Sequence, residues 1–230
     1  IQTNENLENF CKLGAKKKIL FIDTEFDRRN TYYSKLSYVT VHDGNKFWII
    51  DALSGINIKI LTKIITNKNI LKVIHGSQQD LEIFKNLNMD AYPIFDTQIA
   101  AQFCGYEQPI SYANAVHKIY KIEIDKKLQN SDWLKRPVTK KVVDYLKNDV
   151  RYLPGIYRHF NKILKKNQNL LFFNEEMKSL NTSNTVISSS GIRKKINSDT
   201  IHNKKFQNLL TLRDNIARKK NLPKNWIFKD

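Results

Sequence analysis

The chain has 230 residues, which is enough for one large domain or for one domain with part of a second. Hydrophobic residues make up 41% and aromatic residues 11% of it, a composition that excludes a disordered chain. No apolar run reaches the roughly 18 residues of a membrane span, and the first ten residues lack the apolar core of a signal peptide. The two cysteines, Cys11 and Cys104, form no CxxC pair. We therefore expect neither a zinc site nor a disulfide framework, and a cytoplasmic location in which thiols stay reduced.

The formal net charge is +17, from 39 Lys and Arg against 22 Asp and Glu, which suits a polyanionic partner such as nucleic acid. The excess of basic residues also has a second explanation. The basic residues are 31 Lys and only 8 Arg, and the chain also has 25 Asn and 27 Ile, a bias that an AT-rich genome imposes through codon usage. The charge favours nucleic-acid binding modestly and indicates no reaction.

The first hundred residues alternate short apolar runs with segments that carry apolar residues at helical spacing. In chain order, the expected elements are helix 3–13, strands 19–23, 35–41 and 47–51, helix 56–65, strand 71–74, helix 77–87 and strand 93–96. The run at 19–23 is apolar up to its last residue, as expected of a buried central strand. Asp43-Gly44 lies between the next two strands and predicts an antiparallel hairpin. Ser77 is expected to cap the helix that follows it.

Helices dominate the rest of the chain. In chain order, they are expected at 97–103, 111–120, 139–153, 156–166 and 206–219. Pro154-Gly155 is expected to kink or interrupt the third of these helices before the fourth begins, and a stretch rich in Ser, Thr and Asn precedes the last one. Strands that alternate with helices after an antiparallel hairpin indicate an α/β fold, with a mixed sheet flanked by helices.

Two acidic residues follow the most hydrophobic strand. Asp23 and Glu25 are two positions apart, so in a strand both side chains project from the same face. Adjacent carboxylates repel each other unless a cation lies between them, and Mg²⁺ or Mn²⁺ prefers such oxygen ligands. A solvated strand end is the alternative interpretation, because acids are common there.

Further acidic residues lie on or beside predicted helices. Asp80 follows the strand that ends at His75-Gly76, near the edge where ligands gather in open α/β sheets. Taken alone, Asp80 is better explained as an acid that stabilises the first turn of a helix than as a metal ligand. Tyr145 and Asp149 are four positions apart and share one helical face, although such a pair is more often an ordinary surface pair. Asp96, at a strand end, is expected to cap the next helix rather than to bind a metal.

In their order along the chain, these residues resemble the DEDD superfamily of 3′–5′ exonucleases, in its tyrosine-bearing branch. FIDTEF (21–26), IHGSQQDLEIF (74–84) and DYLKNDVRYL (144–153) look like the three exonuclease motifs, the second in its ribonuclease D form. IFDTQIAAQFCGY (94–106) and SDWLKRPV (131–138) also resemble ribonuclease D segments. Five ordered matches argue against chance agreement. The resemblance implies a ribonuclease H-like fold.

The resemblance also implies the roles of five catalytic residues. Asp23, Glu25, Asp80 and Asp149 would be the ligands of two divalent metal ions, Mg²⁺ or Mn²⁺, which stabilise the attacking and the leaving oxygen. Tyr145 would hydrogen-bond the attacking water and aim it at phosphorus, because a phenol is a poor base. The implied reaction releases nucleoside 5′-monophosphates one at a time from RNA with a free 3′ end, with tRNA precursors as the implied substrate.

Contacts with the substrate are expected from five other residues: Thr24, Phe26, His75, Trp133 and Arg136. The resemblance implies that Thr24 contacts the terminal nucleotide through its backbone or hydroxyl, and that Phe26 packs against the base. His75 and Arg136 are expected to reach phosphate groups, and Trp133 to stack on a base. Each assignment except that of Thr24 has a structural alternative, in which the aromatic rings belong to the core and the His and Arg side chains are satisfied within the protein.

Three parts are expected along the chain: a DEDDy-type exonuclease domain at 1–175, a linker at 176–200, and the start of an HRDC-like helical domain at 201–230. The last part rests on FQNLLTLRDNIARKKNLPKNWIFKD (206–230), which resembles the opening of that nucleic-acid-binding module. The module is expected to be incomplete, and Ile1 in place of Met suggests a longer product. A C-terminal helix that packs on the core is the alternative interpretation.

Two other functions stay open. The same five catalytic residues serve DNA-directed 3′–5′ exonucleases, although the form of the second motif and the HRDC-like segment favour RNA. Nuclease folds that lose metal ligands become non-catalytic nucleic-acid-binding modules, but every expected ligand is present here. The sequence therefore predicts a metal-dependent 3′–5′ exoribonuclease, with no membrane and no obligatory protein partner.

Overall fold

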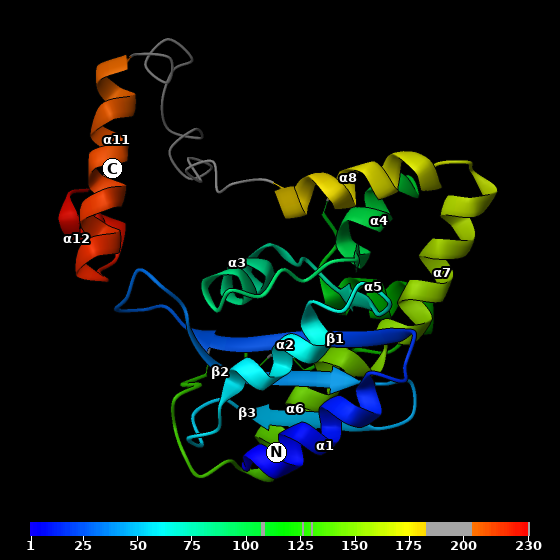
Figure 1. Cartoon of the computed structure of the whole chain (residues 1–230). Coiled ribbons are helices and arrows are strands. Elements are labelled where there is room, and N and C mark those ends of the chain that lie inside the picture. The colour runs from blue at the N-terminus through cyan, green and yellow to red at the C-terminus, as the bar shows by residue number, and fades with distance from the viewer. Residues whose placement is uncertain (107–108, 126, 130, 183–203, 230) are drawn as a thin grey trace. The chain divides into compact units, whose positions relative to one another are not determined.

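The computed structural model describes residues 1–106, 109–125, 127–129, 131–182 and 204–229. Contacts divide the chain into two compact units. Unit 1 comprises residues 1–26 and 36–182, and unit 2 comprises residues 27–35 and 183–230. Figure 1 shows the helices and strands of each unit.

Unit 1 is built on a five-stranded mixed sheet with the strand order β3-β2-β1-β4-β5. The strands are β1 (Ile19–Asp27), β2 (Lys35–His42), β3 (Phe47–Asp51), β4 (Leu71–Ile74) and β5 (Ile94–Asp96). β2 and β3 are antiparallel, whereas β4 is parallel to both β1 and β5. Gly44, in the turn between β2 and β3, has a φ of 94°, which glycine adopts without strain. The predicted hairpin and mixed sheet are confirmed.

Helices surround this sheet (Figure 1). In chain order, they are α1 (Asn4–Gly14), the 3₁₀ helix η1 (Ile58–Leu61), α2 (Thr62–Ile65), α3 (Gln78–Asn86), α4 (Thr97–Phe103), α5 (Tyr112–Tyr120), α6 (Lys140–Arg151), α7 (Leu153–Lys166) and α8 (Leu170–Thr182). α6 contacts β3, α7 contacts β4, and α8 contacts β5. In the part of the chain that is described, no helix has the length and apolarity needed to cross a membrane.

β1 is the central strand, between β2 and β4. Its residues Leu20, Phe21 and Ile22 are buried in the main hydrophobic core, which explains why the run is apolar throughout rather than alternating. Phe21 pairs with Val73 of β4, and β4 ends one residue later. The two acids of β1 therefore lie where the neighbouring parallel strand has ended and its chain turns toward α3.

Three local predictions differ from the structure. Ser77 occupies the position before α3 but makes no capping hydrogen bond, because its hydroxyl donates instead to Asp96 (2.8 Å). Pro154 does not interrupt a helix, because α6 ends at Arg151 and Pro154 lies in the first turn of α7, where its missing N–H is not needed. Residues 176–182 belong to α8 and not to the expected linker. The rest of it, 183–200, lies outside the described residues.

Unit 2 contains α11 (Lys204–Lys220), α12 (Lys224–Ile227) and the segment 27–35. The expected helix at 206–219 is confirmed. The buried carboxylate of Asp214 accepts a hydrogen bond from the Tyr32 hydroxyl (2.9 Å) and pairs with Arg218 and Lys224 (2.6 Å each). This network joins the segment 27–35 to the two helices.

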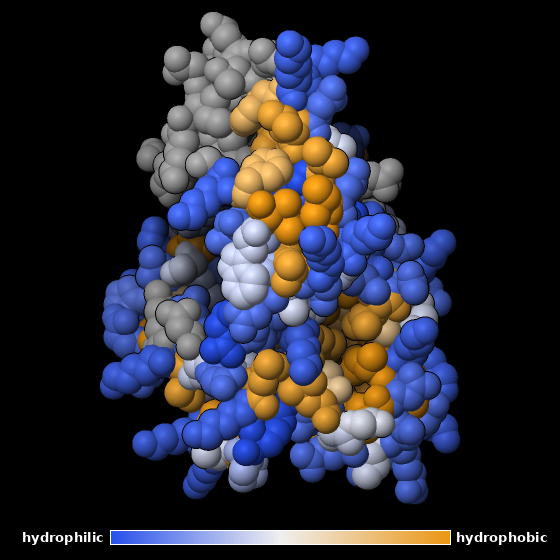
Figure 2. All heavy atoms as spheres, turned by 90° about the vertical axis from the view of Figure 1, so that its left-hand side faces the viewer, coloured by the Kyte–Doolittle hydropathy of each residue, from blue (hydrophilic) through white to orange (hydrophobic). Residues whose placement is uncertain are grey.

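The helices of unit 2 also carry exposed apolar side chains, and Figure 2 shows apolar side chains gathered on the face that is turned to the viewer. Leu209, Leu212 and Trp226 are more than half exposed, whereas the buried residues of α11 are Leu210, Arg213, Asp214 and Ala217. The apolar residues of this helix are thus divided between its buried and its exposed faces. The assignment of this unit as the start of an HRDC-like domain stays a prediction.

Candidate active site

Three carboxylates converge at the carboxyl end of β1. One oxygen atom from each of Asp23, Glu25 and Asp149 lies within 4.8 Å of the other two. The first two acids are two positions apart on β1 and so share one face of the strand. Asp149 comes from α6, whose residues Leu146 and Val150 are buried and fix the helix in place. The structure brings together acids more than a hundred positions apart, as the sequence predicted.

Asp80 lies beside this group rather than within it. It is in the first turn of α3 and is 7% exposed. Its Oδ1 accepts a hydrogen bond of 2.6 Å from the hydroxyl of Thr24, so it is anchored to β1 between the two strand acids. The negative charge of Asp80 also raises the pKa of Asp23 and of Glu25. The fourth predicted ligand is therefore an electrostatic neighbour of the three-carboxylate group.

Burial disfavours the ionised form of all four acids, and repulsion from neighbouring carboxylates adds to this effect for Asp23 and Glu25. Burial first, and the neighbouring carboxylates next, raise the pKa of Asp23 well above its ordinary value and that of Glu25 to about 9. Burial raises the pKa of Asp80 and of Asp149 to about 7. A cation among these oxygens would relieve the repulsion. The donor set is all carboxylate oxygen, with no His or Cys ligand among the described residues, which suits Mg²⁺ or Mn²⁺ rather than zinc.

Tyr145 lies one helical turn before Asp149, and its hydroxyl hydrogen-bonds the carboxylate of Asp149. Burial, followed by the charges of Asp149, Glu25 and Asp23, raises the pKa of Tyr145 far above its ordinary value. The phenol therefore keeps its proton at neutral pH and acts as a hydrogen-bond donor rather than as a base. The role of Tyr145 in positioning the attacking water stays a prediction.

Tyr112 is a residue of this region that the sequence analysis missed. Its hydroxyl donates to the carbonyl oxygen of Asn148 (2.8 Å) and accepts from the N–H of Tyr152 (3.1 Å). Those two groups are four residues apart and would bond each other in a continuous helix, so the hydroxyl bridges the break between α6 and α7. The contact joins residues 36 and 40 positions apart in sequence, and no local pattern signals it.

His75 uses both ring nitrogens within the chain. Its Nδ1 lies 2.8 Å from the hydroxyl of Thr97, and its Nε2 lies 2.9 Å from the carbonyl oxygen of Ile110. A carbonyl only accepts, so the contact with Ile110 requires a proton on Nε2. Burial lowers the pKa of His75, which keeps the ring neutral. These contacts favour the structural alternative to a phosphate contact.

Asp96 caps α4, as predicted. Its side chain accepts hydrogen bonds from the backbone N–H groups of Gln98 (2.8 Å) and Ile99 (3.3 Å). It also accepts from the backbone N–H groups of Gly76 (3.0 Å) and Ser77 (2.7 Å). A single carboxylate thus fixes the start of α4 and the turn that leads from β4 to the helix of Asp80.

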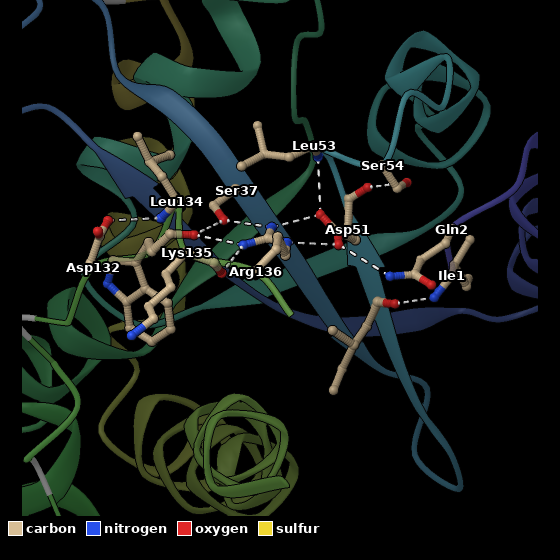
Figure 3. Close-up of polar contacts among 12 residues, drawn as sticks. Ile1, Gln2, Ser37, Asp51, Leu53, Ser54, Asp132, Leu134, Lys135 and Arg136 are labelled. Carbon is tan, nitrogen blue, oxygen red and sulfur yellow. Dashed lines mark hydrogen bonds and ion pairs between the residues drawn. The ribbon is translucent and has the colours of Figure 1, made fainter. Parts of the chain in front are cut away.

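Arg136 is also satisfied within the chain (Figure 3). Its five N–H groups make five hydrogen bonds: two to Asp51, one to Ser37, and one each to the carbonyl oxygens of Trp133 and Lys135. A guanidinium has five donors in all, so none is left for a phosphate group. The structural alternative is therefore favoured for Arg136.

Trp133 is 6% exposed and packs between two tyrosine rings. Its ring centroid lies 6.4 Å from that of Tyr38 and 5.7 Å from that of Tyr145. A buried indole in such contact offers little surface for base stacking, which favours the core alternative.

Thr24 and Phe26 lie on β1 beside the acids. The hydroxyl of Thr24 donates its proton to Asp80, and the side chain of Phe26 is half-buried. Contacts of these two residues with a nucleotide stay predictions.

Comparisons with known proteins identify the family of this chain. The model of a family described as 3′–5′ exonuclease matches residues 1–165. Among curated relatives, a ribonuclease D of Jannaschia sp. (strain CCS1) is 31% identical over 240 residues, covering 100% of this chain and 62% of that protein. A ribonuclease D of Shewanella sp. (strain ANA-3) is 35% identical over 159 residues, covering 69% of this chain and 41% of that protein.

A solved structure supports the same relationship. The crystal structure of Escherichia coli RNase D, described as an exoribonuclease involved in structured RNA processing, has a TM-score of 0.86 and 28% sequence identity. The match covers 100% of this chain and 63% of that one, so this chain spans less than two thirds of its relatives' length. The predicted ribonuclease H-like exonuclease fold is confirmed. The chain belongs to the 3′–5′ exonuclease family, and the relatives named above are ribonucleases D.

Proposed function

We propose that this chain is a metal-dependent 3′–5′ exoribonuclease that releases nucleoside 5′-monophosphates from the 3′ ends of structured RNA. The observation that carries the proposal is the group of three carboxylate oxygens within 4.8 Å of one another, with the Tyr145 hydroxyl beside it. The family model and the similarity to ribonucleases D support the direction of attack and the choice of RNA.

Asp23, Glu25 and Asp149 would hold a divalent cation, and Asp80 would help to hold a second one. When bound, the ions supply positive charge that stabilises the attacking and leaving oxygens of a phosphodiester displacement. We propose Mg²⁺ or Mn²⁺ as the ions, because the donors are hard carboxylate oxygens.

Tyr145 would orient the attacking water. Its hydroxyl lies at the edge of the carboxylate group, and its raised pKa keeps the proton in place. The hydroxyl donates its own proton to Asp149, so its oxygen can accept a hydrogen bond from the water molecule and fix the position of that water without removing its proton. In the reaction, water oxygen bonds to phosphorus and the bond from phosphorus to the 3′ oxygen breaks. The shortened chain keeps a 3′ hydroxyl, and the released nucleotide keeps the phosphate on its 5′ oxygen.

Precursors of tRNA are the substrate that the ribonuclease D relationship suggests, and we propose them as such. Thr24 and Phe26 would contact the terminal nucleotide, since both lie on β1 beside the acids. Unit 2 would contribute nucleic-acid binding as the start of an HRDC-like domain. Two free cysteines suit a cytoplasmic location, and we propose no obligatory protein partner.

The test compares matched single-stranded RNA and DNA oligonucleotides and a tRNA precursor, each labelled at the 3′ end, in Mg²⁺ and in EDTA. Early release of labelled 5′-mononucleotides from RNA, abolished by EDTA, is the expected result. Faster release from DNA would show a DNA-directed exonuclease, and full activity in EDTA would contradict the metal-dependent mechanism. Calorimetric titration with Mn²⁺ separates an inactive binding module, which need not bind two ions, from a nuclease.

A further inference from the structure

An ion pair ties the segment before α6 to the β2–β3 hairpin. Arg136 donates from Nε to Oδ2 of Asp51 (2.9 Å) and from Nη2 to Oδ1 (2.6 Å). Asp51 is the last residue of β3 and is 4% exposed. The guanidinium also lies over the ring of Tyr38 on β2, 4.2 Å from its centroid. Two parallel bonds and a stacked ring fix both the position and the orientation of this side chain.

The same guanidinium fixes the carbonyl group of Trp133. That oxygen accepts from Nη1 of Arg136 (2.9 Å) and from the hydroxyl of Ser37 (2.5 Å). Ser37 in turn accepts from Nη2 of Arg136 (3.1 Å), so the three groups form a closed set of bonds. Figure 3 shows Arg136 pointing toward Asp51, with Ser37 beside it. The backbone at Trp133 is therefore held against β2 through two independent donors.

The Trp133 ring reaches from this anchored backbone to the catalytic tyrosine. Trp133, Tyr38 and Leu146 form a small buried cluster, separate from the main core, and Tyr145 packs against it. The Trp133 and Tyr145 centroids are 5.7 Å apart. Tyr145 is half-buried, and its packing against this cluster limits where its ring can lie.

We infer that Arg136 and Asp51 are positioning residues for Tyr145, acting through Trp133. The inference rests on the proposed function, in which the Tyr145 hydroxyl orients the attacking water. An ion pair on the hairpin holds the backbone of Trp133, and the indole holds the phenol ring at the distance at which its hydroxyl meets Asp149. Arg136 and Asp51 do not contact the substrate in this mechanism. They determine only the position of the Tyr145 hydroxyl group.

The test is a double-mutant cycle of Arg136→Lys and Tyr145→Phe, with kcat and KM measured for RNA trimming. Lysine keeps the charge but has no planar fork for two parallel bonds. We expect Arg136→Lys to lower kcat roughly tenfold, with KM and Mn²⁺ affinity little changed. In the Tyr145→Phe background, the same substitution should change kcat by less than about twofold, because the hydroxyl that it misplaces is already absent.

Lys135→Ala is the matched control, since it removes an exposed cation one position away and should leave kcat unchanged. The inference is wrong if the fold-losses in kcat of the two single variants multiply in the double variant. It is also wrong if Arg136→Lys changes KM instead of kcat. A second readout is the emission of Trp133, obtained by subtracting the spectrum of Trp133→Phe. Arg136→Lys should shift this emission to longer wavelength, and an unshifted emission overturns the inference. If the unmodified protein released no nucleotides, the proposed function would fail, and the emission would still decide whether Arg136 holds Trp133.

Discussion

The hydroxyl of Thr24 donates a hydrogen bond of 2.6 Å to Oδ1 of Asp80, and both side chains are buried. Thr24 lies on β1 between Asp23 and Glu25. The bond therefore connects the strand that carries these two carboxylates to α3, the helix that carries Asp80. It also lowers the pKa of Asp80, in opposition to the larger effect of burial. The bond therefore helps to keep Asp80 in place and ionised.

Thr24→Val is expected to weaken Mn²⁺ binding roughly tenfold, because it removes a group that orients a carboxylate beside the metal site. Calorimetric titration measures this change. Thr40→Val is the matched control, since Thr40 is buried on the neighbouring strand β2 and its hydroxyl has no hydrogen-bond partner among the described residues. Equal Mn²⁺ affinities in the two variants would show that the bond to Asp80 does not matter for the site.

Tyr145→Phe should lower kcat roughly 100-fold while leaving Mn²⁺ affinity unchanged, since the phenol is not a metal ligand and only its positioning hydroxyl is lost. The ring that packs on Trp133 is retained, so the fold is expected to stay intact. Single-turnover assays and calorimetry measure the two quantities. An unchanged rate would remove Tyr145 from the mechanism without affecting the assignment of the carboxylates.

Tyr112→Phe should lower the free energy of unfolding by about 1–2 kcal/mol, because the Asn148 carbonyl and the Tyr152 N–H lose the hydroxyl that bridges them. Asp149 follows Asn148 directly, so Mn²⁺ affinity should fall as well. Tyr157→Phe on α7 serves as the control for loss of a tyrosine hydroxyl. If urea denaturation and calorimetry give both variants the same values, Tyr112 does not support the break between the two helices.

The acidic group also predicts how stability changes with pH in EDTA. The folded-state pKa of Asp149 is about 7, raised by burial from its ordinary 3.8. A raised pKa means that the stability contribution is present at low pH and is lost as the pH rises toward 7. The stability of Asp149→Asn relative to the unmodified protein should therefore rise between about pH 4 and pH 7 and stay level above that. A gain that shrinks with rising pH in urea denaturation would contradict the raised pKa.

The strands and the acids could be predicted from sequence because their signals are local. The apolar run before Asp23 gives the central strand, and the four-residue spacing of Tyr145 and Asp149 places both on one face of α6. α8 was missed although Phe173 and Met177 are buried and four positions apart, because the neighbouring Leu171 and Phe172 are apolar and exposed and obscure the amphipathic pattern.

The structural roles of Arg136 and Trp133 could not be predicted in the same way. Asp51 lies 85 positions before Arg136, and no local pattern links them. An arginine and a tryptophan in a loop fit contacts with nucleic acid as well as they fit structural roles until their partners in the fold are known. The segment 27–35 shows the same limit, since the bond from Tyr32 to Asp214 spans 182 positions and places a loop after β1 in a unit with the last helices.

In the proposed function, the converging carboxylates catalyse the release of 3′-terminal nucleotides. The most direct measurement compares Asp149→Asn with Asp144→Asn on RNA labelled at the 3′ end, in Mg²⁺. Both changes remove one negative charge from α6, but Asp144 is exposed and outside the three-carboxylate group. We expect Asp149→Asn to stay folded and to release no 5′-mononucleotide, whereas Asp144→Asn should be as active as the unmodified protein. Undiminished release by Asp149→Asn would contradict it.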